Sequence, residues 1–471
     1  MAVTSNPLDA LLFYMNGHKD WRWNFTQAEG GKSFAAGVGE AVRITYSFPQ
    51  TKPAYADETG FRAFGAAEKG GVRAVMDAIE AVCNVDFVEV PRIGDITFAW
   101  GSISAAAHAY APFTDYYVWS NGLIDDVSMV DYAGDVWFNR LAVYTADEWK
   151  PGGGAFWTMM HEMGHSLGLK HPFDGENVLP ASLNNVGNTV MAYGVAPEMV
   201  VWDYNGVSVD AYWLYPSTPM VMDIRALQFL YGANTDTHSG NTTHKWLQNE
   251  ELFETIWDGG GIDTIDCSNQ VLDCVINLNP GKFSSIAQRK TDAQVLEALG
   301  VPSNYTVTED VYRGQNNLAI AYDTIIENAT GGSGHDRIIG NRANNKLAGG
   351  GGNDVLTGGA GKDRLSGGAG NDVFDFNKKM DLGTVATRTD TVLDYVSGMD
   401  RLDLAGIDAN DVKAGNQAFS FLGSRNFSAD ATGQLRFSGG VLYGSTDKDR
   451  DAEFTINLAG VTGLTAADII L

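Results

Sequence analysis

Residues 331–375 read GGSGHDRII GNRANNKLA GGGGNDVLT GGAGKDRLS GGAGNDVFD, five units of nine residues that follow one another without a gap. Aspartate stands at the sixth position of four units, and Leu356, Leu365 and Phe374 share one apolar position. A flexible glycine-rich linker needs neither kind of residue in a fixed phase. The period therefore predicts successive coils that stack into a parallel β-roll, with the apolar side chains filling the space between them.

The chemistry of the repeats predicts calcium binding. Glycines allow backbone conformations that aim carbonyl oxygens inward, and the aspartates add carboxylates, so the ligands are all oxygens, as Ca²⁺ prefers. The second unit departs from the pattern, because residues 341–343 replace glycine or small residues and Asn345 replaces aspartate, and we expect its site to be weaker or absent. The predicted ligands are Gly332, Gly334, Asp336, Gly349, Gly350, Gly352, Asp354, Gly358, Gly359, Ala360, Gly361, Asp363, Gly367, Gly368, Ala369, Gly370 and Asp372, followed by Asp381 and Asp390, which keep the spacing without the glycines.

Composition limits the possible classes of protein. The 471 residues suffice for two or three domains, and glycine is concentrated after residue 330. A formal net charge of -26 argues against nucleic acid as a partner. No apolar stretch approaches the roughly 18 to 20 residues of a membrane-spanning helix. The three cysteines do not form a disulfide framework; for Cys267 and Cys274, a bridge across a hairpin and two free thiols are both open.

The chain before the repeats has the pattern of a mixed α/β layer. Residues 41–49 alternate as a half-buried strand, and apolar residues recur at helical spacing over 71–82. Gly232 and the polar residues after it end the last helix, which places a domain boundary at Asn234, between an N-terminal domain (1–234) and a C-terminal domain (235–471). Further strands are expected at 86–90, 94–101 and 134–139, and further helices at 158–167 and 220–231.

The predicted catalytic chemistry lies in the segment HEMGHSLGLKH, which begins at His161. His161 and His165 are one helical turn apart, so both imidazoles project from the same face. Gly168 allows the helix to stop and the chain to turn, which brings His171 round as a third nitrogen ligand. Three imidazoles leave an open zinc position for water, as in catalytic sites. Zinc lowers the pKa of that water, and Glu162 is predicted to act as the general base.

These residues resemble the metzincin peptidases, and His171 followed by Pro172 is similar to the serralysin branch, secreted bacterial proteases with calcium-binding tails. NTVMAYG resembles the Met-turn of that family, which implies that Met191 forms a hydrophobic floor beneath the zinc. The same resemblance implies that Tyr193 is a further zinc ligand, which swings away and helps to stabilise the oxyanion. The implied fold is α+β and multidomain: a metzincin-type α/β zinc protease domain, then an all-β parallel β-roll with a C-terminal β-sandwich-like segment.

Two further segments resemble parts of the same family. AHAYAPF, residues 107–113, is similar to the edge strand against which an extended peptide substrate lies, although an ordinary edge strand is an equally good interpretation. DGGGIDT, residues 258–264, resembles an additional calcium loop. The resemblance implies substrate binding by Ala107, Ala109 and Tyr110, and calcium binding by Asp258, Gly260, Asp263 and Glu327.

The resemblance also implies a location and partners. It implies export through a type I secretion channel without an N-terminal signal peptide, and the apolar run from Ala10 is too short for a signal-peptide core. The ending DIIL, residues 468–471, is similar to an acidic-then-apolar terminal signal, with an ordinary terminal strand as the alternative. Extracellular calcium sites bind at about 0.1 to 1 mM, so we expect the repeats to fold only outside the cell. The implied partners of the monomer are protein and peptide substrates, the secretion machinery and a proteinaceous inhibitor.

The sequence thus predicts a secreted, calcium-dependent zinc endopeptidase. An alternative from another class is a calcium-folded adhesin or surface-layer protein with a decayed metal site, against which the intact His161, Glu162 and His165 argue. A repeat-bearing lipase, the other enzyme class considered, would need a nucleophilic serine on a GxSxG elbow, which we do not expect this chain to contain.

Overall fold

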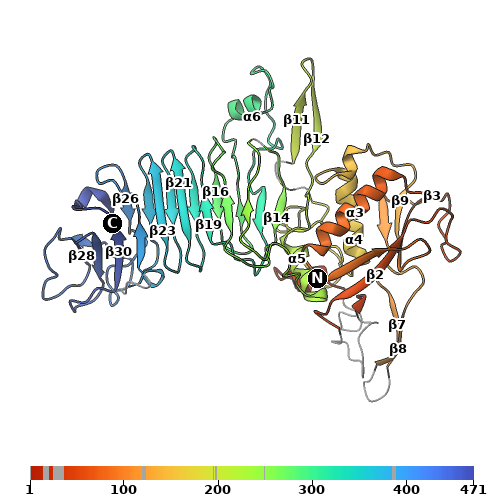
Figure 1. Cartoon of the computed structure of the whole chain (residues 1–471), viewed down its shortest axis with the longest axis horizontal. Helices are drawn as coiled ribbons and strands as arrows, with labels where there is room; N and C mark the ends of the chain where they lie inside the picture. The colour runs from red at the N-terminus through yellow and green to blue at the C-terminus, as the bar shows by residue number, and fades with distance from the viewer. Residues whose placement is uncertain are drawn as a thin grey trace.

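The computed structural model describes residues 2–13, 21–24, 37–118, 124–194, 196, 199–248, 250–383 and 389–471. Residues 14–20, in the segment considered for a signal peptide, lie outside this set. The molecule is elongated, with an α/β part at one end, a stack of β-coils in the middle and β-hairpins near the C-terminus (Figure 1). Strands rather than helices make up most of the regular structure.

A six-stranded sheet organises the N-terminal part, in the order β4-β2-β5-β9-β6 with β3 paired to β5. β4, β2, β5 and β9 are parallel neighbours, whereas β6 runs antiparallel to β9 at the edge of the sheet. The strands predicted at 41–49, 86–90, 94–101 and 134–139 are therefore confirmed. Their bounds are β2 (Val42–Ser47), β3 (Arg62–Ala63), β4 (Val85–Glu89), β5 (Ile96–Gly101), β6 (Ala107–Ala109) and β9 (Val136–Asn139).

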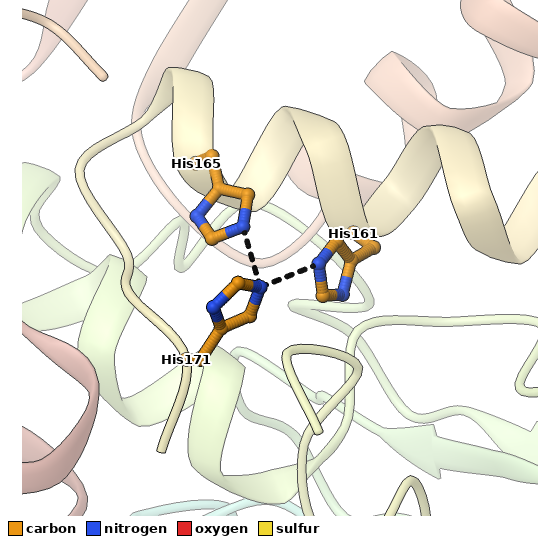
Figure 2. Close-up of side chains that lie close together, drawn as sticks. All are labelled: His161, His165 and His171. Carbon is orange, nitrogen blue, oxygen red and sulfur yellow. Dashed lines mark hydrogen bonds between the residues drawn. The ribbon is translucent and has the colours of Figure 1, made fainter. Parts of the chain in front are cut away.

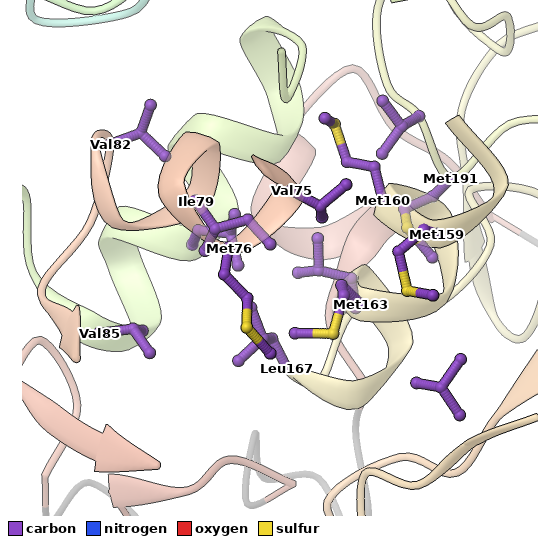
Figure 3. Close-up of a cluster of buried hydrophobic side chains, with 14 of the residues drawn as sticks. Val75, Met76, Ile79, Val82, Val85, Met159, Met160, Met163, Leu167 and Met191 are labelled. Atoms are coloured by element: carbon purple, nitrogen blue, oxygen red, sulfur yellow. The ribbon is translucent and has the colours of Figure 1, made fainter. Parts of the chain in front are cut away.

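Two helices pack together against this sheet. Val75, Met76 and Ile79 of α3 (Ala66–Glu80) face the methionine-rich side of α4 (Gly154–Ser166) in one buried apolar cluster (Figure 3). α3 begins five residues before the predicted start, because none of residues 66–70 is fully buried and the large apolar side chains recur only from Val72. The predicted last helix is confirmed as α5 (Val221–Tyr231).

Several small elements were not predicted. β11 and β12 form an antiparallel hairpin that projects from the molecule on the same side as α6 (Figure 1). The bounds of these elements are β1 (Ala2–Val3), α1 (Pro7–Leu11), β7 (Thr114–Val118), β8 (Ile124–Met129), η1 (Asp147–Trp149), β10 (Asn177–Val178), β11 (Val200–Tyr204), β12 (Val209–Trp213) and α6 (Asp292–Ala298).

The repeats form parallel coils, as predicted. Each unit contributes one strand, and successive strands alternate between two sheets, so that equivalent residues 18 apart lie side by side. The strands of the repeats are β20 (Arg337–Ile339), β21 (Lys346–Gly351), β22 (Val355–Thr357), β23 (Arg364–Ala369) and β24 (Val373–Asp375). The flanking strands are β13 (Thr243–His244), β14 (Glu254–Ile256), β15 (Thr264–Asp266), β16 (Val275–Asn277), β17 (Phe283–Ser284), β18 (Leu318–Ile320), β19 (Asn328–Thr330), β25 (Asp390–Val392) and β26 (Arg401–Asp403).

The apolar position of the repeat fills the interior between the two sheets. Leu356, Leu365 and Phe374 are 0% exposed. Burial of one such side chain stabilises a fold by about 1.5–3 kcal/mol. The coils therefore share one continuous apolar core, separate from the core around α3 and α4.

The C-terminal strands continue the two sheets of the roll. β30, β29 and β28 form an antiparallel meander beside β25, and the two-residue strand β27 ends that sheet. β31 pairs with β26 and ends the other sheet. The bounds are η2 (Lys379–Asp381), β27 (Ser420–Phe421), β28 (Gln434–Ser438), β29 (Val441–Ser445), β30 (Phe454–Leu458), η3 (Ala466–Asp468) and β31 (Ile469–Ile470). Cys267 and Cys274, whose pairing the sequence left open, are buried free thiols.

Candidate active site

Local geometry aims the histidines of α4 away from the apolar core. Met159 and Met163 lie on the side of the helix that faces α3 (Figure 3), while His161 and His165 lie on another side. The helix ends at Ser166, and Gly168 follows with φ 96. A Cβ there would lie 2.2 Å from the carbonyl oxygen of Trp21. The sharp turn that the sequence predicted at Gly168 therefore requires glycine.

The turn brings His171 between the two helical histidines (Figure 2). Its Nε2 atom lies 3.2 Å from Nε2 of His161 and 3.1 Å from Nε2 of His165. The three side chains predicted as zinc ligands are thus brought together, with one ring nitrogen of each at a common point.

The other ring nitrogen of each histidine faces an oxygen. Nδ1 of His161 lies 2.8 Å from the carbonyl of Val190, and Nδ1 of His165 lies 2.8 Å from the carbonyl of Leu169. Nδ1 of His171 lies 2.7 Å from the carboxylate of Asp174. Because these oxygens can only accept, each Nδ1 carries the proton and each Nε2 carries a lone pair. Converging lone pairs do not bond to one another, so the arrangement fits a cation bound by three imidazoles.

Burial keeps the imidazoles of His161 and His165 neutral. It lowers the pKa of His161 to about 4, and it lowers the pKa of His165 well below its usual range. Neutral imidazole is the form that binds metal ions.

Glu162 lies beside the histidines in an environment of its own. Burial raises the pKa of its carboxyl to about 8, while a hydrogen bond from the backbone N–H of Ala109 opposes that rise. Ala109 belongs to β6, so the carboxyl group contacts the edge strand predicted to hold substrate. A group with its pKa near neutrality is suited to take up and release protons.

Tyr193 reaches the same point from the segment after the Met-turn. Its hydroxyl lies 2.8 Å from Nε2 of His171, and its ring stacks on that of His161 with centroids 5.4 Å apart. The side chain is 61% exposed, so it has room to move.

The segment around Met191 packs directly under the helix. Met191 is 0% exposed, and a Cβ on Gly164 would lie 2.3 Å from its sulfur. Gly164 stands between His161 and His165 in the helix, so the methionine supports the turn that carries both histidines. Gly164 was assigned no role from the sequence, although it lies within the segment HEMGHSLGLKH.

Two positioning carboxylates were missed by sequence reasoning. Asp174 holds the ring of His171. It lies three residues after His171 in the sequence, so that spacing could have identified it. Asp223 of α5 accepts hydrogen bonds from the hydroxyl of Thr189 and the backbone N–H of Val190, whose carbonyl faces His161. No spacing rule links Asp223 to the histidines, because the contact is purely tertiary.

The lipase alternative is excluded by the place of the serine. GHSLG at residues 164–168 does match GxSxG, but Ser166 is fully buried within α4 rather than on an exposed strand-to-helix turn. Its hydroxyl donates to the carbonyl oxygens of Gly134 and Glu162, at 2.8 and 3.1 Å.

A cavity of about 980 Å³ opens beside the first turns of α4. Trp157 and Tyr215 line it with their rings stacked 4.9 Å apart, and the ring of Trp157 lies 5.9 Å from that of His161. On the predicted substrate strand, the Tyr110 hydroxyl donates to Glu58 at 2.8 Å, and Ala107 is buried. Its backbone N–H donates to the carbonyl of Asp135 and its carbonyl accepts the N–H of Gly134, both at 3.0 Å, so the side chain and the backbone of Tyr110 are both held within the protein.

Four aspartates of the roll have one carboxylate oxygen that accepts a hydrogen bond and one that does not. In Asp354, Asp363, Asp372 and Asp390, Oδ1 accepts a backbone N–H from a neighbouring coil. Among the described residues, the buried Oδ2 atoms of these four side chains and of Asp263 have no hydrogen-bond partner. A buried carboxylate oxygen without a partner is costly, so these five positions fit a bound cation.

Other predicted calcium positions differ. Both carboxylate oxygens of Asp336 accept backbone N–H groups, from Cys274 and Gly332. The side-chain amide of Asn345 donates to the carbonyl of Glu327 at 2.8 Å, so the amide nitrogen of Asn345 is already paired within the protein. Asp381 lies in the short helix η2, close enough to Asp363 and Asp390 for its charge to raise the pKa of both carboxyl groups.

The glycines of the repeats let one coil approach the next. A Cβ on Gly350, Gly359 or Gly368 would lie 2.0–2.4 Å from a carbonyl oxygen of the preceding coil. Gly352, Gly361 and Gly370 make similarly close approaches, and all six have positive φ. Gly349, Gly358 and Gly367 instead face the aspartate carboxylates. Two further predicted glycines also lie close to backbone: Gly332 faces the carbonyl of Gln270, and Gly334 faces the backbone of Leu272. Ala360 and Ala369, the last predicted positions, lie in the glycine turns of the repeats.

In the 258–264 loop, Oδ1 of Asp258 accepts the backbone N–H of Gly260 at 2.9 Å. The backbone N–H of Asp263 donates to Glu327 at 2.8 Å. The structure thus brings Glu327 to the loop that holds the other three predicted residues, Asp258, Gly260 and Asp263.

Comparison with known proteins agrees with this geometry. The family described as "Peptidase M10 serralysin C terminal" matches residues 220–304 and 301–471. Metallopeptidase AprA of Pseudomonas marginalis is 36% identical over 383 residues, which cover 74% of this chain and 69% of the relative. Serralysin of Proteus mirabilis is 30% identical over 465 residues, 90% of this chain and 86% of the relative. Serralysin of Photorhabdus laumondii is 31% identical over 471 residues, 94% of this chain and 84% of the relative.

None of the helices in the described part of the chain is both long and apolar enough to cross a membrane. Identity at this level over most of the chain, together with the family match over its C-terminal half, confirms the resemblance seen in the sequence and favours the peptidase over the adhesin alternative. The chain belongs to the serralysin family of metallopeptidases.

Proposed function

We propose that the protein is a zinc endopeptidase whose zinc is held by His161, His165 and His171, with Tyr193 as a further ligand. The observation that carries the proposal is the convergence of three Nε2 lone pairs, each fixed by an oxygen at Nδ1. Three nitrogen donors with an open position are typical of catalytic zinc. When bound, zinc polarises a substrate carbonyl and makes a water molecule acidic.

Glu162 acts as the general base in this proposal. Its carboxyl pKa of about 8 reflects burial, and a divalent cation nearby favours the charged form, which can accept a proton. Glu162 then takes a proton from the attacking water and delivers it to the departing amine. Tyr193 donates its hydroxyl proton in a hydrogen bond to the developing oxyanion, and its exposure permits that movement.

The substrate is proposed to be an extended peptide segment of a protein. β6 ends the sheet order of the described strands, so the backbones of Ala107 and Ala109 are proposed to pair with the substrate in antiparallel fashion. Tyr110 adjoins them, but its N–H and carbonyl already pair with Asp135 and Gly134. The contact between Ala109 and Glu162 places this edge beside the base. The cavity lined by Trp157 and Tyr215 accommodates a large side chain next to the cleaved bond.

Calcium is proposed as a structural cofactor of the roll. The unpartnered oxygens of Asp263, Asp354, Asp363, Asp372 and Asp390 support it, and the glycine turns supply carbonyl oxygens. The satisfied polar atoms of Asn345 support the expectation of a weak or absent site in the second unit.

The proposed organisation is a metzincin-type catalytic domain (1–234) and a calcium-binding domain (235–471), supported by the two separate apolar cores. We propose that the protein is secreted, through a type I channel, and that calcium folds the roll outside the cell. The terminal residues Asp468 and Ile469 are packed in the structure, so a role in secretion would be exercised before folding.

The proposed chemistry is tested with Glu162→Gln, which keeps the shape of the side chain but removes the base. Casein cleavage should fall by roughly 10²–10⁴-fold, the usual contribution of general acid–base catalysis. Zinc content should stay the same, because Glu162 is not a ligand in this proposal. Unchanged cleavage would refute the assignment, and a joint loss of zinc would show that Glu162 holds the metal instead.

A further inference from the structure

A second cluster of metal-binding side chains lies after α5, outside the catalytic site and outside the repeats. One ligand atom each of His238, His244 and Asp258 lies within 4.8 Å of the others. Nε2 of His244 is 3.2 Å from Oδ2 of Asp258, whose side chain is 0% exposed. The rings of the two histidines meet edge to face, with centroids 5.4 Å apart.

The backbone holds these side chains from two segments. His244 belongs to β13, which pairs in parallel with β15. Oδ1 of Asp258 is occupied by the N–H of Gly260, which leaves Oδ2 turned toward His244. The backbone of Thr237, next to His238, accepts the N–H of Gly259, next to Asp258, at 2.8 Å. Main-chain hydrogen bonds therefore fix the approach of the two segments.

His238 has the second hydrogen bond that is typical of a metal ligand. Its Nδ1 lies 3.2 Å from the carbonyl oxygen of Trp257, so Nδ1 carries the proton and Nε2 carries a lone pair. Metal-binding histidines usually donate their other N–H to a carbonyl or carboxylate in this way. The residue also holds a φ of 51, in the left-handed region that few residues other than glycine adopt.

We propose that His238, His244 and Asp258 bind a divalent transition metal ion of the zinc class. Two imidazoles and one carboxylate suit such an ion, whereas Ca²⁺ takes oxygen ligands. Zinc places tetrahedral ligand atoms about 3.4 Å apart, so a modest closure of the cluster completes the site. His238 is exposed and can make that adjustment, and the open position left by three ligands takes water.

The site goes beyond the proposed function and has a different part in the molecule. Its ligands lie on the segment that leaves α5 and on the loop that begins the roll. The ion would clip these two segments together at the junction between the two apolar cores. Asp258 was expected in a calcium loop, and its carboxylate also lies within hydrogen-bond range of the carboxylate of Asp263. The proposed site therefore shares Asp258 with that loop, and its Oδ2 faces His244.

The test is equilibrium dialysis of the full chain against Zn²⁺ in saturating calcium, with metal counted per chain. The wild type should bind two zinc ions, and His238→Gln/His244→Gln should bind one. Zinc affinity at the second site should fall roughly 100-fold or more, since loss of even an outer partner of a metal ligand costs 10–100-fold. Both substitutions leave every carboxylate in place, so circular dichroism in calcium should not change.

Controls separate this site from the catalytic one. His335→Gln, which removes an exposed histidine of the repeats, should still bind two ions. His161→Ala/His165→Ala should lose the other ion and keep the one at His238, whether or not the proposed peptidase chemistry is right. His238→Gln alone, at an exposed position, repeats the test if the double variant misfolds. An equal zinc count in the wild type and the His238 variants would overturn the proposal, whereas a single zinc in the wild type that is lost in those variants would instead overturn the catalytic zinc.

Discussion

Asp223 shows how a residue far from the chemistry can set its geometry. Its buried carboxylate accepts the N–H groups of Val190 and Met220 and the hydroxyl of Thr189. The carbonyl of Val190 in turn holds Nδ1 of His161. A shift of this carboxylate would thus reach the ring of His161 through one residue, Val190.

We expect Asp223→Asn to destabilise the fold by about 1–3 kcal/mol, because an amide nitrogen would face backbone donors. Zinc affinity should fall by about 10–100-fold through the His161 contact, with kcat reduced more than KM. Urea unfolding and chelator competition measure the two effects. Asp86→Asn, in an exposed ion pair with Arg43, is the matched control and should change neither. Full zinc affinity in Asp223→Asn would contradict the positioning role.

Gly164 is a second residue whose effect can be isolated. A Cβ there would lie 2.3 Å from the Met191 sulfur, while nothing lies within 4 Å of a Cβ on Gly70 of α3. Gly164→Ala should therefore destabilise by about 1–3 kcal/mol through overpacking. Gly70→Ala should stabilise by about 0.5–1 kcal/mol through helix propensity. Thermal unfolding of both variants checks the contrast. Equal changes in stability would show that the side chain of Met191 moves aside without destabilising the fold.

At the scale of elements, the coils of the roll depend on their aspartates unequally. Asp372 has an unpartnered buried oxygen, whereas Asn371 beside it is exposed. We expect Asp372→Asn to remove calcium binding at its turn and to lower the melting temperature in saturating calcium. Isothermal titration gives the stoichiometry. Asn371→Ser should match the wild type, and an unchanged stoichiometry in Asp372→Asn would exclude that aspartate as a ligand.

Elements with a strong local period were predictable, and those held by tertiary contacts were not. The repeats, β2 and α5 follow directly from side-chain spacing, and so do the histidines of α4. The start of α3 was placed late, because none of the residues of its first turn is fully buried. The hairpin β11–β12 and the roles of Asp174 and Asp223 were missed, since the partners of these residues are set only once the chain has folded.

At the scale of the whole molecule, buried carboxylates make calcium-free stability depend on pH. Burial raises the pKa of Asp354 and Asp390 to about 7 and that of Asp363 to about 8. Carboxyl groups with a raised pKa bind more protons in the folded state, so their contribution is full below the unfolded pKa of about 3.9 and is lost as pH rises through the folded values.

The calcium-free chain should accordingly melt at a higher temperature at pH 5 than at pH 8. Saturating calcium should abolish or reverse this order, because the ion binds the charged carboxylates. Circular dichroism melts with chelator and with calcium provide the comparison. A calcium-free melting temperature that increases from pH 5 to pH 8 would be inconsistent with these carboxyl groups controlling the roll.

Each sheet of the roll ends in a strand of only two residues, β27 in one and β31 in the other. Stacked coils otherwise present a long row of unpaired backbone groups, which is a template for joining another copy end to end. β27 and β31 therefore leave little backbone at the C-terminal edges for a second copy to pair with. A chain that lost β27–β31 would expose the edges of β25 and β26 instead.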